Sequence, residues 1–521
     1  MGNSKSSTER CPHCHVSGSA SSKIRDKVMT RCRRNRTGTC AGCQKLLDIE
    51  CKIEETRRTL DNLLKEKEAL ASTLNEHHDP LSYRLPVEIT SRIFLQSLPL
   101  SSADVETHYS WDYDAKSFIK SVLLLGHVSK YWRKVARGTP KIWSILCLMV
   151  NRSNCLNTVL FMREWLELSG GLPLCIQLRV ERKQNDVVTA VLQKVVVSLI
   201  EHAHRWKMID FDIPHYLLPW VSSAMPIQQL SCLEHIELGV TSTHSDDLDA
   251  TSVLSLRASP RWLTQGNIRL SQISINMEHL THFYSRGSIE MDDCIQLFRD
   301  APRLLTCDIQ EVTGHASSNV LVTSPSLQTL KTGELPENWW NSLTLLSLEE
   351  LTVDEPIDES WMQLHSLLQR SGCKLKVFNI VDTDPNPDML EVLELTPHLQ
   401  QLDLYGGIIR EPLFSMMNAA ASSTPNFLRN LTSLILYVSE NAFDWTWLLV
   451  FLTTMTTRPE SSLRVVIFTY LEPLCDEPIP GTLRDKKTFN LVLDILRNVE
   501  LSVLDTENAD LVELLRNYHK L

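Results

Sequence analysis

A short apolar pattern recurs along the second part of the chain and restricts its fold more than any other feature. Each copy has apolar residues at a first position, three residues later and two residues after that. The first positions lie 21 to 37 residues apart. The last two apolar residues alternate with polar ones, as a short strand with one buried face requires. The copies are Trp206/Ile209/Phe211, Leu233/Ile236/Leu238, Leu270/Ile273/Ile275, Leu304/Cys307/Ile309, Leu348/Leu351/Val353, Leu375/Phe378/Ile380, Leu399/Leu402/Leu404, Leu431/Leu434/Leu436 and Leu463/Val466/Phe468, with a weaker copy at Leu327/Leu330.

Helical segments precede several copies and end near a proline. Cys294 to Phe298 precedes Pro302, and Met389 to Leu393 precedes Pro397. A helix–turn–strand unit cannot bury its apolar face alone, but stacked units share one core. The sequence therefore predicts an irregular leucine-rich-repeat solenoid over residues 170–521, with a parallel sheet on its concave side. The segment 172–178 is expected to be the entering strand and 491–515 to cover the far end. A mixed α/β domain with a parallel sheet and no true repeat is the alternative.

Three short motifs precede the repeats. The first runs Leu-Pro-x-Glu-Ile from Leu85 and is followed by Ile93 and Phe94. Proline is accepted in a first helical turn, and Glu88 complements the helix dipole there. Ile89, Ile93 and Phe94 are expected to share one helix face.

The second and third motifs lie some forty residues later. They read Val-Ser-x-x-Trp-Arg-x-x-Ala from Val128 and Thr-Pro-x-x-Trp from Thr139. Val128, Trp132 and Val135/Ala136 are expected on one helical stripe that ends before Pro140. Two small amphipathic helices in an unrelated helical domain are the alternative.

The ordered set of three motifs resembles an F-box, and more narrowly the F-box-like proteins of mushroom-forming fungi. Relative to that family, residues 98–120 lengthen the middle of the box. The resemblance implies an F-box-like helical domain over residues 80–148 that binds the Skp-type linker subunit of a cullin-based ubiquitin ligase. It also implies that the remainder of the chain selects a target for protein ubiquitination. The residues that it marks for partner binding are Leu85, Pro86, Ile89, Ile93, Phe94, Val128, Trp132 and Trp143.

Residues 46–78 form the next unit towards the N-terminus, with a clear heptad pattern. Apolar residues step by three and four, without glycine or proline, until Pro80. The pattern predicts a coiled-coil-like helix whose seam over 46–76 either self-associates, parallel or antiparallel, or folds back onto the rest of the chain. Its seam positions are Leu46, Ile49, Ile53, Thr56, Leu60, Leu63, Lys67, Leu70 and Leu74.

Residues 1–45 form a basic tail that contains cysteines. The tail contains ten lysines and arginines, and its only acidic residues are Glu9 and Asp26. Two Cys-x-x-Cys pairs can supply four thiolates to a structural zinc ion, and a disordered tail with spare thiols is the alternative. The pairs are Cys11/Cys14 and Cys40/Cys43.

The chain opens with Met-Gly-x-x-x-Ser, which fits the pattern for N-myristoylation at Gly2. One acyl chain binds membranes only marginally, and the arginines at 31–36 could supply the second signal. An unmodified basic tail is the alternative. Peripheral membrane association is expected only if Gly2 is acylated.

Composition limits the remaining functions. The net charge of −11 does not favour nucleic acid, and we find neither a signal peptide nor a membrane-spanning stretch. The scattered cysteines read as free thiols of an intracellular protein, cytoplasmic or nuclear. No phosphate-binding glycine loop and no catalytic motif can be written, so we expect a non-enzymatic protein without cofactors apart from the zinc considered above.

Two functions therefore remain. The leading prediction is an F-box-type substrate receptor whose solenoid binds an unknown protein target. The alternative is a non-enzymatic scaffold, dimeric through 46–76, in which the F-box helices only cap the solenoid.

Overall fold

The computed structural model describes the chain from Ala41 to Leu504, with gaps, and divides it into two units. The first unit includes residues up to Leu98 and Lys120–Gly138, and the second includes Pro99–Ile119 and Thr139 onwards. The described residues are 41–78, 84–99, 115–151, 155–180, 186–225, 230–240, 253–315, 321–354, 358–381, 387–406, 409, 411–424, 426–439, 445–456, 463–470 and 500–504.

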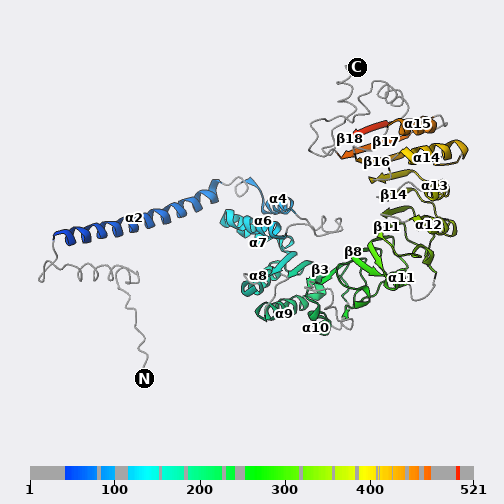
Figure 1. Cartoon of the computed structure of the whole chain (residues 1–521). Helices are drawn as coiled ribbons and strands as arrows, with labels where there is room; N and C mark the ends of the chain where they lie inside the picture. The colour runs from blue at the N-terminus through cyan, green and yellow to red at the C-terminus, as the bar shows by residue number, and fades with distance from the viewer. Residues whose placement is uncertain are drawn as a thin grey trace, which may run out of the picture. The chain divides into compact units, whose positions relative to one another are not determined.

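The first unit is helical. Figure 1 shows its longest element, α2, as one unbroken helix. This confirms the helix that the heptads predict and begins it five residues earlier, at Ala41. The helices are α2 (Ala41–His78), α4 (Val87–Ser97), α6 (Ala115–Val128), whose first turn the division assigns to the second unit, and α7 (Lys130–Arg137).

The second unit is built on one parallel sheet. Within the described residues, fourteen strands pair in chain order, and every pairing in this sheet is parallel. The α/β class with a parallel sheet is therefore confirmed. The strands are β1 (Ile145–Val150), β2 (Leu174–Val180), β3 (Trp206–Ile213), β4 (His235–Val240), β6 (Trp262–Gln265), β8 (His282–Glu290), β9 (Thr306–Thr313), β11 (Thr329–Glu334), β13 (Glu350–Asp354), β14 (Val377–Val381), β15 (Gln401–Tyr405), β16 (Ser433–Ser439), β17 (Arg464–Tyr470) and β18 (Glu500–Leu504).

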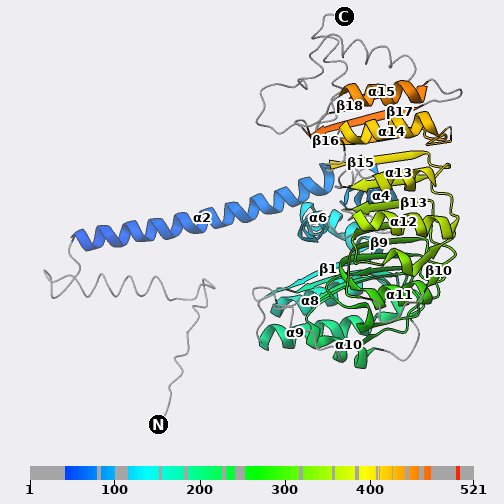
Figure 2. The same ribbon diagram turned by 45° about the vertical axis from the view of Figure 1, so that its right-hand side comes forward.

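Helices connect most of these strands, because a parallel pairing needs a crossover. In Figures 1 and 2, α11 to α15 follow one another along the same side of the sheet. The α-helices are α8 (Cys155–Leu168), α9 (Asp186–Ile200), α10 (Leu218–Ala224), α11 (Met291–Asp300), α12 (Asp358–Ser371), α13 (Pro387–Glu394), α14 (Glu411–Ser423) and α15 (Trp445–Thr456). Shorter elements are the 3-10 helices η1 (Pro140–Trp143), η2 (Ala203–Arg205), η3 (His215–Leu217), η5 (Leu270–Gln272) and η6 (Trp340–Ser342), and the two-stranded sheets β5 (Leu254–Ser255)/β7 (Ile273–Ser274) and β10 (Val322–Ser324)/β12 (Leu343–Leu345).

Two rows of side chains run across the sheet and form its core face. In β13, for example, Leu351 and Val353 are buried, whereas their neighbours in the strand are half-buried. The register aligns such residues from strand to strand, so the core is continuous. The first row contains Leu146, Ile176, Ile209, Ile236, Leu263, Phe283, Cys307, Leu330, Leu351, Phe378, Leu402, Leu434 and Val465.

Two copies of the apolar pattern are placed differently from the prediction. Ile273 lies in the small β5/β7 sheet and not in the main one. In β17 the core residues are Val465 and Ile467, both 0% exposed. The predicted core position, Val466, is therefore wrong by one residue. The main sheet also contains β1, β6 and β8, which no copy predicted, and β1 begins inside the segment 80–148 that was expected to be helical.

Among the described residues, no helix has the length and apolar character needed to cross a bilayer.

Candidate functional site

Apolar residues of α4 are divided between two faces. Phe94 is 1% exposed and packs on Trp132 of α7, with ring centroids 4.8 Å apart. Thr90, one turn earlier, is also buried, whereas Ile89 and Ile93 are 44% and 37% exposed. The expectation that Ile89, Ile93 and Phe94 share one face is therefore wrong, because Thr90 and Phe94 form the buried stripe.

The start of α4 follows from its proline. Pro86 is the residue before the helix, and its carbonyl oxygen accepts hydrogen bonds from the N–H groups of Ile89 and Thr90, both at 3.1 Å. Glu88 lies in the first turn, near the positive end of the helix dipole. Leu85 is half-buried just before it. The motif thus sets where the helix begins.

The second motif contains a helix break. Val128 ends α6, and the Oγ atom of Ser129 accepts a hydrogen bond of 3.1 Å from the backbone N–H of Trp132. Val128 is 49% exposed, whereas Val135 and Ala136 of α7 are buried. The single stripe predicted from Val128 to Ala136 is therefore wrong, since a serine N-cap starts a new helix inside it.

Trp143 does not belong to the same unit as the other candidates. It belongs to η1 in the second unit and is only 7% exposed. Its ring meets that of Trp165 edge-on, with centroids 4.8 Å apart, and the Trp165 Nε1 donates to the Ile145 carbonyl oxygen at 2.9 Å. Trp143 therefore packs inside the second unit.

α4 and α6 expose three further apolar side chains that the motifs did not predict: Val87, Leu123 and Leu124. The exposure of Leu123 and Leu124 could have been predicted from the sequence, because residues 122–125 are all apolar and a helix cannot turn four consecutive residues towards one core. Six large apolar side chains of α4 and α6 are therefore exposed. They are Val87, Ile89, Ile93, Leu123, Leu124 and Val128.

Packing inside the unit holds these helices together. The Phe94–Trp132 contact joins α4 to α7, and the Arg133 Nε donates to the Gly126 carbonyl oxygen of α6 at 2.8 Å. Trp132 is thus half-buried by its own unit. The arrangement presents apolar side chains on helices whose positions are fixed by other residues.

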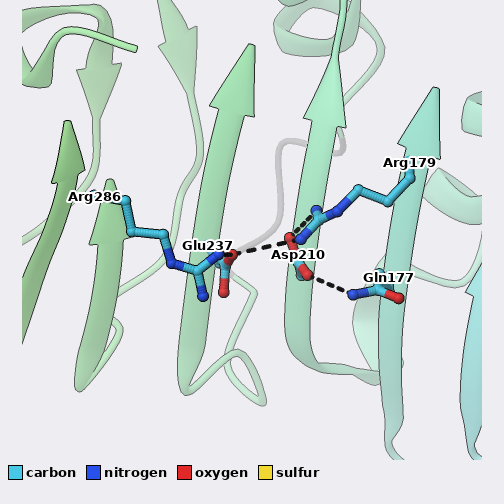
Figure 3. Close-up of polar contacts among 5 residues, drawn as sticks. All are labelled: Gln177, Arg179, Asp210, Glu237 and Arg286. Carbon is cyan, nitrogen blue, oxygen red and sulfur yellow. Dashed lines mark hydrogen bonds and ion pairs between the residues drawn. The ribbon is translucent and has the colours of Figure 1, made fainter. Parts of the chain in front are cut away.

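A polar cluster lies on the face of the sheet opposite the core face (Figure 3). The cluster joins β2, β3, β4 and β8 and consists of Gln177, Arg179, Asp210, Glu237 and Arg286. Arg179 pairs with Asp210 and, at 3.6 Å, with Glu237, and the Arg286 Nη1 lies 2.7 Å from the Glu237 Oε1. Gln177 donates to the Asp210 Oδ2 at 3.0 Å.

Burial and pairing act against each other in this cluster. Asp210 is 0% exposed, and burial raises its pKa, although Arg179 and the Gln177 hydrogen bond oppose this. Burial also disfavours the charge of Arg179, but Asp210 and Glu237 together raise its pKa. Each carboxylate is held by a guanidinium, so neither is placed as a general base. The cluster is an ionic clamp across the strands.

Next to the clamp, three aromatic rings stack on neighbouring strands. The Trp262 and His282 rings are 3.8 Å apart and nearly parallel, at 5°, and His235 lies 5.9 Å from Trp262 on its other side. Burial lowers the pKa of His235 to about 4 and also lowers that of His282. The stack is therefore uncharged at neutral pH and adds an apolar region beside the charged one.

A second polar group lies on the same face, in β14 and β15. Asn379 and Asp403 are register partners, and within the described residues the Oδ1 atom of each has no hydrogen-bond donor. The Gln401 Nε2 donates to the Asp403 Oδ2 at 3.0 Å. Burial raises the pKa of Asp403 to about 6; the Gln401 hydrogen bond lowers it, and the charge of Glu350 adds to the rise.

This pKa predicts how stability changes with pH. The folded state holds the Asp403 proton more tightly than the unfolded state, whose aspartate pKa is about 3.9. The contribution of Asp403 to stability is therefore lost as pH rises from about 4 to about 6. We expect Asp403→Asn to unfold at higher urea concentration than wild type at pH 8 and at the same concentration at pH 4. Glu391→Gln, on the exposed side of α13, should change neither. Equal shifts at both pH values would contradict this origin.

A pocket of about 340 Å³ lies between α8 and α9. Two of its polar side chains, Arg205 and His202, contact neighbouring backbone carbonyl groups. Arg205 donates to the Leu172 carbonyl oxygen at 2.9 Å and to Ser169 at 2.7 Å, and the His202 Nδ1 lies 3.1 Å from the Ser198 carbonyl oxygen. These contacts close helix ends and turns, and they leave no nucleophile–base pair among the pocket's described side chains.

The zinc and lipidation predictions fall on another part of the chain. Gly2, Cys11, Cys14 and Cys40 lie outside the described residues, and Cys43 lies in α2. Both predictions stay predictions. Within the described part of the chain, no group of three or more His, Cys, Asp or Glu side chains is placed to hold a metal ion.

The chain was compared with protein-family models and with curated proteins, and neither comparison found a match.

Proposed function

We propose that this chain is a non-enzymatic F-box-type substrate receptor, which links a target protein to a cullin-based ubiquitin ligase through a Skp-type linker subunit. The exposure of Ile89 and Ile93 on α4 is the observation that carries the proposal. Both belong to the first F-box-like motif, and both are accessible in a unit whose core is filled by other residues. Apolar side chains presented by a helix are where binding energy concentrates in helix-in-groove contacts.

The division of roles within the motifs supports the proposal. Phe94, Trp132 and Val135 hold the helices together, whereas Ile89, Ile93 and Val128 remain for a partner. The additional exposure of Leu123 and Leu124 enlarges the surface available to a linker subunit. Exposed apolar side chains of this kind are expected where a partner protein binds.

We propose further that the sheet of the second unit is an irregular leucine-rich-repeat solenoid. We also propose that the face of the sheet opposite the core face, called the polar face below, binds the target. The chain-ordered parallel strands and the helices along one side support this proposal. The polar face offers charged, aromatic and amide side chains on a rigid support, as a recognition surface requires.

The alternative is a scaffold in which the F-box helices only cap the solenoid, and it requires a different burial of the α4 side chains. A cap would bury Ile89 and Phe94 against the repeats. Phe94 is already covered by Trp132 of its own unit. This contact favours the receptor.

Binding of a purified Skp-type linker subunit to the full chain tests the proposal. We expect wild type to bind and Ile89→Asp to weaken binding by about thirtyfold or more, because a charge would be buried in an apolar contact (about 2 kcal/mol). Ser91→Asp places the same charge on the same helix but about 160° around it from both Ile89 and Ile93, and should bind as wild type does. Circular dichroism of each variant checks that it is folded.

Trp132→Ala is a second control, because Trp132 stabilises the unit. It should lower thermal stability in step with binding, whereas Ile89→Asp should lower binding alone. A folded wild-type chain that does not bind the linker would overturn the proposal.

A further inference from the structure

The heptad seam of α2 is exposed along its whole length. Its nine positions are those given above from Leu46 to Leu74, and all nine are exposed. The seven leucines and isoleucines among them are 46% to 60% exposed. α2 has 38 residues, and in proteins most of the stability of such a helix comes from packing its apolar face. The heptad pattern therefore predicts a packing partner for the seam, and the exposed seam residues show none.

The polar seam positions are compatible with burial. The Thr56 hydroxyl donates to the Lys52 carbonyl oxygen of its own helix at 2.7 Å, so covering it leaves no unpaired donor. Lys67 has a long aliphatic stem and can extend its ammonium group to the edge of a contact. The seam is thus continuous enough to bind another helix.

We propose that the packing partner is α2 of a second copy of this chain, running antiparallel. This proposal goes beyond the receptor function and does not depend on it. A second copy fits the seam because two copies bring identical heptad spacing, and knobs-into-holes packing needs the same spacing on both helices.

Charge distinguishes the two orientations. In a parallel pair in register, Lys67 would face Lys67 of the second copy inside the seam. Lys52 would face Arg57 at the flanking positions, twice per dimer, and two contacts between Lys45 and Glu50 would oppose this repulsion. Three like-charge contacts therefore compete with two opposite-charge contacts, and one of the three is buried.

In the antiparallel pair, Ile53 packs against Leu63 of the second copy. Lys67 then meets Ile49, and Thr56 meets Leu60. Lys52 flanks the seam opposite Glu66, twice per dimer, and only Arg57 faces a like charge, its own copy at the dyad. The antiparallel pair places no lysine against a lysine in the seam, and its charges are the more favourable.

The two orientations differ in what they do to the ends of α2. With a rise of 1.5 Å per residue, the antiparallel pair separates the two His78 ends by about 60 Å along the axis. A parallel pair would bring them within about 10 Å. The proposal therefore has a geometric consequence besides self-association.

Sedimentation equilibrium of the full chain tests the proposal, because reversing the charge of Lys52 should weaken an antiparallel dimer but strengthen a parallel one. We expect wild type to dimerise and Lys52→Glu to weaken dimerisation about tenfold, because glutamate would face Glu66 twice per dimer. Glu66→Lys should weaken it likewise, and the double variant should restore it. In a parallel dimer Lys52→Glu would face Arg57 and strengthen association.

Lys65→Glu is a closely matched control. Both lysines have an aspartate four residues before them (Asp48, Asp61) and a glutamate three residues after (Glu55, Glu68). The local cost to the helix is therefore the same, but Lys65 points away from the seam. It should dimerise as wild type does.

Cysteine crosslinking provides an independent readout. Two differently tagged chains, Ile53→Cys and Leu63→Cys, should form a mixed crosslink under mild oxidation, whereas neither should crosslink with itself beyond the wild-type level. Self-crosslinking of each single variant, or a monomer at every concentration, would overturn the proposal. Loss of linker binding with dimerisation intact would overturn only the receptor function.

Discussion

Replacing Asp210 with alanine is expected to lower the free energy of unfolding by about 3 kcal/mol. Asp210 is fully buried, accepts a hydrogen bond from Gln177 and pairs with Arg179. Removing the carboxylate leaves the buried amide of Gln177 without its acceptor and leaves Arg179 with Glu237 alone, at 3.6 Å. Breaking a buried ion pair from one side costs more than the pair itself contributes, because the remaining charge stays desolvated.

Urea unfolding followed by circular dichroism measures this loss. Asp212→Ala is the matched control, since Asp212 lies two residues later on the same face of β3 but is only half-buried. It should cost less than about 1 kcal/mol. The double variant Arg179→Met/Asp210→Leu should recover most of the stability, because it removes both charges together. A cost of Asp210→Ala no larger than that of Asp212→Ala would show that the clamp does not stabilise the sheet.

Phe378→Ala is expected to lower the free energy of unfolding by about 4 kcal/mol. Phe378 is 0% exposed in the first core row, between Leu351 and Leu402 of the adjoining strands. Truncation removes most of an aromatic ring from a packed layer and leaves a cavity that neighbours on a regular sheet cannot readily close.

The neighbouring residue provides the control for this prediction. Val377→Ala changes the opposite face of β14, where the side chain is half-buried, and should cost about 1 kcal/mol. Because each strand contacts only its two neighbours in the sheet, hydrogen exchange should accelerate chiefly in β13, β14 and β15. Acceleration spread evenly over the sheet would contradict this local character.

Much of the second unit could be predicted from spacing alone. The pairs Leu351/Val353, Phe378/Ile380 and similar pairs lie in the core rows, as alternation indicates. The spacing works because each strand has one buried face and strands of neighbouring units align in register. The parallel sheet then follows, since a helix between two strands permits no antiparallel hairpin.

Three departures have physical reasons. In β17 the run 464–468 carries apolar residues on both faces, so a period of two cannot choose between them. In β6 and β8 the second core position is polar: the Gln265 Nε2 donates to the Ile268 carbonyl oxygen at 2.7 Å, and the Ser285 Oγ donates to the Gly287 carbonyl oxygen at 2.6 Å. Local turns satisfy these polar groups, and an apolar pattern misses such strands.

The candidate site was predicted less completely. The motifs coincide with α4 and α7 but did not indicate which apolar side chains are buried, because Ser129 starts a new helix and Trp132 packs inward. The sequence gives only a weak indication of the ionic clamp, namely single polar residues at alternate positions of three apolar strands. The two partners of Asp210 are 31 and 33 residues from it along the chain, and Arg286 is 49 residues from Glu237. Such pairs are fixed by register alone.

The order of the strands has a consequence for the growing chain on the ribosome. Every strand of the main sheet pairs with the strand that was synthesised just before it in that sheet. Phe378, for example, pairs only 27 residues after Leu351, which takes about 1–5 s at typical elongation rates. No strand has to wait for a distant partner, so loop-closure entropy stays small at each step. The second unit can therefore assemble from its first strand onwards, each new strand adding to the most recently made edge of the sheet.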